Sequence, residues 1–108
     1  MVTVADEMAA LSRLHGIAAA EERYSLEYDG AYATLPELIE KGYIGDPSQG
    51  KLSGYRFEIR VAERGFQATA VPVKYGVTGK RSFYVDESKM VRGADKAGAP
   101  ASSADPAL

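Results

Sequence analysis

Hydrophobic and polar residues along the first thirty positions repeat with the period of an α-helix. At about 100° per residue, the apolar side chains gather into one stripe with a second edge beside it. The stripe comprises Val4, Met8, Leu11, Leu14, Ala18 and Leu26, and the second edge comprises Ile17, Tyr24 and Tyr28. The pattern predicts a single helix over residues 4–29, roughly 39 Å long at about 1.5 Å per residue. Every later element is predicted to be shorter, so we expect the chain to fold onto this helix.

Local capping signals predict a second, short helix. Thr34-Leu35-Pro36-Glu37 has the composition of a capping box, in which the threonine hydroxyl and the glutamate carboxylate satisfy amides at the helix start. Proline in the first turn removes no amide that the helix needs. The helix is predicted over residues 35–41 and should end at Gly42, which can adopt the left-handed conformation.

Alternation with a period of two begins at Tyr55 and is typical of half-buried strands. Strands are predicted over residues 55–62, 65–72, 81–86 and, more briefly, 89–92. In the third of these, Phe83 and Val85 should face inward and Tyr84 outward. Strands with one apolar face indicate an antiparallel sheet, and the long helix is the element large enough to cover that face. The predicted fold class is therefore α+β: a long N-terminal helix packed across a three- to four-stranded antiparallel meander, with the short helix in the connection between them.

The 108 residues are enough for one domain, which we place at residues 1–92. From Gly93 onward the composition is dominated by Ala, Gly, Ser, Pro and Asp. Such a segment has too little apolar area to order itself, so residues 93–108 are predicted to be a disordered tail.

Charge and composition exclude several classes of function. Thirteen basic and fifteen acidic side chains give a net charge of −2, which argues against a nucleic-acid partner. Arg56, Arg60 and Arg81 do not change this, because Glu58 stands between the first two and favours cross-strand charge pairing. The absence of cysteine excludes a disulfide framework and a thiolate nucleophile. The sequence contains no apolar run long enough to span a membrane and no signal peptide, so an anchoring segment, if the natural protein has one, lies outside it.

No residue pattern predicts catalysis, cofactor binding or a metal site. His15 is the sole histidine and is expected to be structural or exposed, since it lacks the partners of a zinc site or a catalytic triad. The adjacent carboxylates Asp6-Glu7 and Glu21-Glu22 point about 100° apart on a helix, which disfavours paired acid–base chemistry. We therefore predict that the protein is not an enzyme and needs no cofactor.

Two short segments resemble ligand loops but are better explained as connections. The segment Gly76–Ser82 has two residues between its glycines where a phosphate loop needs four, and it precedes a strand. Asp86-Glu87-Ser88 offers oxygen ligands for weak calcium binding, but a full site needs six to eight of them. A hairpin connection and a turn are the favoured interpretations.

Taken in order, the segments resemble the type IV pilins and pseudopilins, specifically the globular head without its membrane-embedded helix half. The resemblance covers about residues 3 to 92. It rests on Asp6-Glu7-Met8-Ala9-Ala10-Leu11, on residues 14–24, on Tyr28-Asp29-Gly30-Ala31-Tyr32-Ala33-Thr34-Leu35-Pro36-Glu37-Leu38, on Ser53-Gly54-Tyr55-Arg56-Phe57, and on residues 65–72 and 79–88. The hydrophobic segment and processing site of a prepilin are absent from this sequence, as is the cysteine pair of many pilins.

The resemblance implies a structural subunit of a type IV pilus or of a type II secretion pseudopilus, which acts by helix-mediated filament assembly in protein transport or at the cell surface. It implies a location at the bacterial cell surface or in the periplasm. The expected partners are other pilin or pseudopilin subunits, and the inner membrane only through the absent hydrophobic segment. The alternative is a soluble pilin-like binding module, or a separately encoded pilin head that docks on another helical subunit.

If the chain is such a subunit, its charged helix residues are candidates for contacts between subunits. These candidates are Asp6, Glu7 and Glu22. The loops 45–54 and 74–80 would form the variable outer surface. A helix that continues a longer rod should also project at its start, with residues 4–8 clear of the sheet and Met8 partly exposed.

Overall fold

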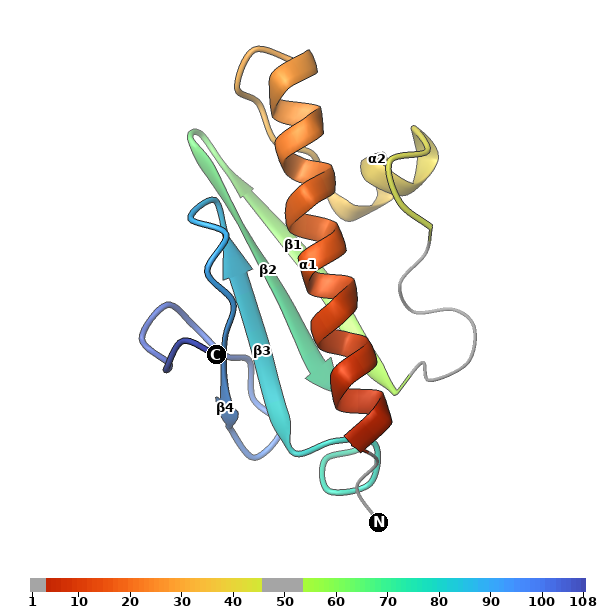
Figure 1. Cartoon of the computed structure of the whole chain (residues 1–108), viewed down its shortest axis with the longest axis vertical. Coiled ribbons are helices and arrows are strands. Elements are labelled where there is room, and N and C mark those ends of the chain that lie inside the picture. Colours follow the sequence, from red (N-terminus) through yellow and green to blue (C-terminus); the bar gives the residue numbers. More distant parts are fainter. Residues whose placement is uncertain (1–3, 46–53) are drawn as a thin grey trace.

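The computed structural model describes residues 4–45 and 54–108, and it contains two helices and one four-stranded sheet (Figure 1). The elements are α1 (Val4–Glu27), α2 (Leu35–Glu40), β1 (Tyr55–Ala62), β2 (Gly65–Pro72), β3 (Arg81–Asp86) and β4 (Arg92–Asp95). The strands follow the order β1-β2-β3-β4 and every neighbouring pair is antiparallel. The helix α1 lies across one face of this sheet (Figure 1). The predicted α+β class and meander are confirmed.

Local sequence signals account for most element boundaries. The capping box of α2 is present: the Glu37 amide donates to the Thr34 hydroxyl at 3.4 Å, and the Thr34 amide donates to the Glu37 carboxylate at 3.0 Å. The helix α1 ends two residues before its predicted end, where Gly30 (φ +85°) donates its amide to the Ser25 carbonyl. The fourth strand begins at Arg92 rather than at residue 89, because a turn with Lys89 at φ +67° occupies the residues before it.

The core forms between the inner face of α1 and the sheet. Ala68 and Ala70 are fully buried at the centre of β2, where their small side chains let α1 approach closely. The remaining members of the main cluster come from α1, from the strands and from the residue before β4. They are Ala10, Leu14, Ile17, Ala18, Tyr55, Phe57, Phe66, Phe83, Val85 and Val91.

The buried face of α1 is rotated from the predicted apolar stripe. Met8 is 63% exposed and Leu26 is 80% exposed, although both were placed in that stripe. Leu14 and Ala18 of that stripe are buried as predicted, but the buried face also includes Ala10 and Glu21, which the stripe did not contain. The orientation of the helix is set by how it packs on the sheet, where the small Ala68 and Ala70 allow a close approach, and the hydrophobic pattern of the helix alone does not determine it.

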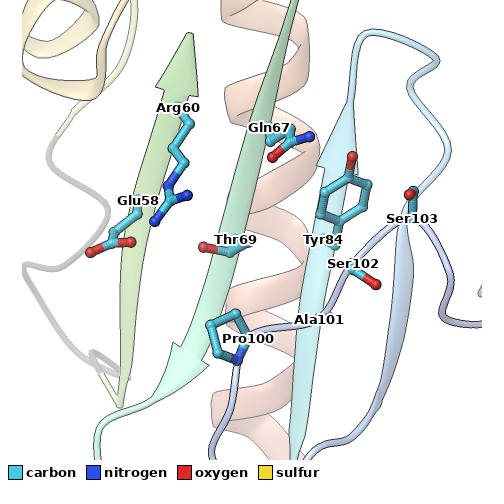
Figure 2. A pocket seen from close by; sticks show the side chains of 9 residues that line it. All are labelled: Glu58, Arg60, Gln67, Thr69, Tyr84, Pro100, Ala101, Ser102 and Ser103. Atoms are coloured by element: carbon cyan, nitrogen blue, oxygen red, sulfur yellow. The ribbon is translucent and has the colours of Figure 1, made fainter. Parts of the chain in front are cut away.

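The C-terminal residues also differ from their prediction. Residues 93–108 were expected to be disordered, yet they contain most of β4 and then cross the outer face of the sheet (Figure 2). Ala101 and Asp105 are buried. Backbone hydrogen bonds and polar side chains hold this segment, which explains why its low apolar content did not reveal its order. Tyr84 faces outward as predicted, but this cover leaves it only 4% exposed.

Candidate functional site

The first candidate contact residue, Glu7, binds to other residues of its own chain. Its side chain is buried, and one carboxylate oxygen accepts the amides of Lys80 and Arg81 at 2.9 and 3.1 Å. The Arg81 guanidinium lies 3.4 Å from the other oxygen. Burial opposes the charge, but these amides and the guanidinium outweigh it and lower the pKa of Glu7. Glu7 therefore fastens the start of β3 to α1, and in this structure it is not available to a neighbouring subunit.

Asp6 is buried as well, at 9% exposure. It lies against Gly54, which Thr78 also approaches: a methyl group on Gly54 would come within 3.2 Å of the Asp6 carboxyl carbon. The first turn of α1 is thus docked on the residue before β1 and on the connection between β2 and β3. The prediction that residues 4–8 project from the sheet is wrong for Asp6 and Glu7, whereas Ala5 and Met8 are exposed.

Glu22 is the one candidate that lies on the surface. Its carboxylate is 2.7 Å from the ammonium group of Lys89, and both side chains are about half exposed. A small groove of about 80 Å³ lies beside this pair, between α1 and the sheet, with Leu26 and Phe66 among its lining residues. An exposed ion pair of this kind contributes at most about 1 kcal/mol to stability. Glu22 could therefore leave Lys89 for a partner on another molecule with little loss of stability.

Glu22 belongs to a row of exposed residues that runs along α1 outside its buried face. Their spacing alternates between three and four residues, as in the seam of a helix that packs against another helix. We call this row the outer stripe, and it comprises Ala5, Met8, Ser12, His15, Ala19, Glu22 and Leu26. Its middle is slim, since Ala19 is exposed and a methyl group added to the neighbouring Gly16 would touch nothing.

A second surface feature is a polar groove on the outer face of the sheet (Figure 2). Its volume is about 240 Å³. The strands supply Glu58, Arg60, Gln67, Thr69 and Tyr84, and the C-terminal segment supplies the opposite wall, Pro100–Ser103. Sequence reasoning missed this groove because it depends on the path of a segment that was expected to be disordered.

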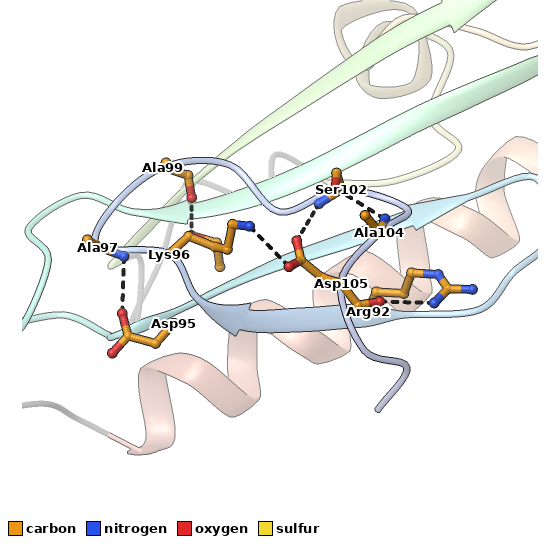
Figure 3. A network of polar contacts seen from close by, with 9 residues as sticks. Arg92, Asp95, Lys96, Ala97, Ala99, Ser102, Ala104 and Asp105 are labelled. Carbon is orange, nitrogen blue, oxygen red and sulfur yellow. Dashed lines mark hydrogen bonds and ion pairs between the residues drawn. The ribbon is translucent and has the colours of Figure 1, made fainter.

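Asp105 holds that wall in place (Figure 3). Its carboxylate accepts the Ser102 amide at 2.8 Å and pairs with the Lys96 ammonium at 3.1 Å, while its carbonyl accepts from Arg92 at 2.9 Å. The Ser102 amide and the Lys96 charge lower the pKa of Asp105. The segment is therefore secured by charge and backbone bonds rather than by apolar packing.

Glu21 is a buried acid that the sequence analysis did not single out. Its side chain is fully buried between α1 and the turn that leads to α2. One carboxylate oxygen accepts the Ala33 amide at 2.7 Å, and the other has no hydrogen-bond partner. Burial raises the pKa of Glu21 to about 7, against the opposing effect of the Ala33 amide. Glu21 lies between the buried Ile17 and Tyr24 on the inner face of α1, and this position in the sequence could have predicted its burial.

The remaining candidate chemistry is accounted for by local structure. His15 is exposed, and residues 4–45 and 54–108 contain no group of three potential ligands that could hold a metal ion. Asp86 accepts the Ser88 amide at 2.9 Å and the Tyr84 hydroxyl at 2.8 Å, so its oxygens are used in a turn. The glycine-containing connection closes on itself, with the Gly76 amide donating to the Gly79 carbonyl at 2.8 Å. Of the two predicted outer loops, residues 46–53 lie outside the described residues.

The fold and surface thus define an α+β domain with an exposed helix stripe and a polar groove. Within the described ranges, no helix is long and apolar enough to cross a membrane. A comparison with family models, with curated proteins and with solved structures found no significant match to this chain.

Proposed function

We propose that this chain is the head domain of a filament-forming subunit of the type IV pilus or type II secretion pseudopilus class. Its partners would be other pilin or pseudopilin subunits. It would be located at the bacterial cell surface or in the periplasm. The observation that supports this proposal best is the outer stripe of α1. A 24-residue helix in a domain of this size leaves one whole side unused by its own core.

The chemistry of the outer stripe suits a contact between helices. Met8 and Leu26 expose large apolar side chains near its two ends. Between them, the small residues Ser12 and Ala19 would let a second helix approach closely, and His15 and Glu22 are the polar members of the row. Burial of apolar area contributes about 25 cal/mol per Å², so two such side chains would add usefully to a repeated contact.

Ala19→Arg tests this function. Arginine is a good helix former and position 19 is exposed, so the isolated domain should unfold at an unchanged temperature. In a bacterium that carries the change in the complete gene, we expect filament yield, measured by electron microscopy and shearing, to fall tenfold or more, because a long charged side chain would hold neighbouring helices apart.

The matched control is Ala31→Arg, the same change at an exposed position beyond the end of α1. It should leave both filament yield and thermal unfolding unchanged. Normal filaments in the Ala19→Arg strain would contradict the proposal.

The rival function is a soluble binding module, and the polar groove is the observation that favours it. A binding module would tolerate Ala19→Arg without any phenotype. It would instead lose function when Thr69→Tyr fills the groove between the sheet and Pro100–Ser103.

A further inference from the structure

The two edges of the sheet differ in how they are protected. The β4 edge is covered by the chain's own C-terminus: the Gly93 amide donates to the Pro106 carbonyl at 3.0 Å, and the Leu108 amide donates to the Val91 carbonyl at 3.0 Å. At the other edge (Figure 1), β1 pairs with β2, and no other strand of the described residues pairs with it. An eight-residue edge strand with unpaired backbone groups is a template for a further strand.

The register of the hairpin fixes which backbone groups point outward. Ala62 and Gly65 flank a two-residue turn, so this pair exchanges both backbone hydrogen bonds. Bonded pairs then recur at every second residue, which directs the backbone groups of residues 56, 58 and 60 toward β2. The amides and carbonyls of Phe57, Ile59 and Val61 therefore face the open edge.

Space and apolar surface are available on the inner side of this edge. A groove of about 480 Å³ runs along residues 57–60, and Leu35 and Pro36 at the start of α2 form its other wall. Val61 is 42% exposed and Ile59 is half-buried. A strand added here would cover apolar side chains on that face.

The outer side of the same edge carries alternating charge. Arg56, Glu58 and Arg60 follow one another at every second position, all exposed. Within the described part of the chain, none of them takes part in an ion pair. A second antiparallel copy complements these charges when the two strands are offset along the edge, so that Glu58 of each copy faces an arginine of the other.

We propose that β1 pairs antiparallel with β1 of a second copy of this chain, with Ile59 on the two-fold axis. In this register Glu58 lies opposite Arg60 of the partner subunit, and Arg60 opposite the partner's Glu58. These are the non-hydrogen-bonded positions, where facing side chains come closest. Ile59, Phe57 and Val61 occupy the hydrogen-bonded positions, in agreement with the outward direction of their backbone groups.

The neighbouring registers fit less well. With Glu58 on the axis, the two glutamates would face each other and Arg56 would oppose the partner's Arg60, which places like charges together. With Phe57 on the axis, Arg56 would pair with the partner's Glu58, but Val61 would remain uncovered. The Ile59-centred register alone satisfies the charges and also covers Val61.

The contact is isologous and small, so the dimer should be weak. Two-fold pairing of short strands buries less than the roughly 1,200 Å² that stable interfaces need. We expect dimerisation in the high-micromolar range. It uses the β1 edge and no residue of the outer stripe, so it can be tested independently of the proposed filament function.

Charge reversal tests the pairing by sedimentation equilibrium on the whole chain, from about 10 µM to 1 mM. Glu58→Arg alone and Arg60→Glu alone should each raise the dimer dissociation constant at least tenfold, because each puts like charges opposite one another. Mixing the two variants should restore dimerisation, since every facing pair in the heterodimer is then of opposite charge. Both positions are exposed, and circular dichroism should confirm that each variant is folded.

Arg56→Glu is the matched control, because residue 56 faces Ala62 of the partner subunit in this register and should have little effect. The proposal is overturned if the unmodified chain stays monomeric up to 1 mM, or if the mixture of variants fails to dimerise. It is also overturned if Arg56→Glu abolishes the dimer while Arg60→Glu does not, because that result would place Phe57 on the axis.

Discussion

Replacing Glu21 by glutamine is expected to stabilise the domain by up to about 3 kcal/mol at pH 8 and to change its stability little at pH 4. The glutamate is fully buried, and its pKa is raised from 4.5 to about 7 by that burial. Each pKa unit corresponds to about 1.4 kcal/mol between the two protonation states. Glutamine keeps an oxygen to accept the Ala33 amide and never carries the charge that burial disfavours.

The direction of the pH dependence follows from proton linkage. Between pH 4.5 and about 7 the folded state holds the Glu21 proton while the unfolded state has released it. Stability must therefore fall as the pH rises through this range. Urea unfolding of the unmodified chain from pH 4 to 8 should show this fall, and the Glu21→Gln variant should show a flatter profile.

Glu22→Gln is the control for this experiment, since the side chain is adjacent in sequence but half exposed. It pairs with Lys89 on the surface, so the change should shift stability by less than about 1 kcal/mol at every pH. If Glu21→Gln were no more stable than the unmodified chain at pH 8, Glu21 would not be carrying a buried charge.

The elements that sequence patterns predicted well are those whose signals are local. Alternation over residues 55–62 and 65–72 indicates β1 and β2, because alternate positions such as Phe57 and Ala68 lie in the hydrophobic core. The capping box sets the start of α2 because its two hydrogen bonds lie within four residues. Such signals need no knowledge of the rest of the chain.

The errors arose where distant parts of the chain decide the outcome. The buried face of α1 depends on the small side chains of Ala68 and Ala70, which are far away in sequence. The order of the C-terminal segment depends on the contacts of Asp105 and on pairing with β4. The candidate contact residues were chosen as charges on a helix. Whether such a charge faces solvent or a backbone amide is settled only by the loop that packs beside it, as Glu7 and Glu22 illustrate.

Glu7 and Glu21 are both buried glutamates of α1, yet they differ in how well their charge is solvated by the protein. Two backbone amides and a guanidinium surround the Glu7 carboxylate. A single amide reaches Glu21, and its second oxygen has no partner. This contrast explains why burial raises the pKa of Glu21, whereas the hydrogen bonds lower that of Glu7 despite burial.

Replacing Glu7 by alanine is therefore expected to destabilise the domain at pH 7 by roughly 2–4 kcal/mol. The change leaves the Lys80 and Arg81 amides without their acceptor, and hydrogen bonds to a charged group make a net contribution of about 1.5–3 kcal/mol each. Water that reaches the vacated amides recovers part of this loss. The change also frees β3 from the start of α1. Urea unfolding at pH 7 measures the loss, and hydrogen exchange should show faster opening of the Lys80 and Arg81 amides.

The pH dependence distinguishes this electrostatic role from simple loss of packing. Because the folded-state pKa of Glu7 lies below 4.5, the unmodified chain gains stability from it above that value and loses the gain as the pH falls through the folded-state pKa. The difference between the unmodified chain and Glu7→Ala should consequently shrink in acid, and Glu7→Gln should lose an intermediate amount at pH 7. A difference that stayed constant from pH 7 to pH 3 would mean that Glu7 acts through its methylene groups. In that case the carboxylate would be free to meet a neighbouring subunit after all, as the sequence first suggested.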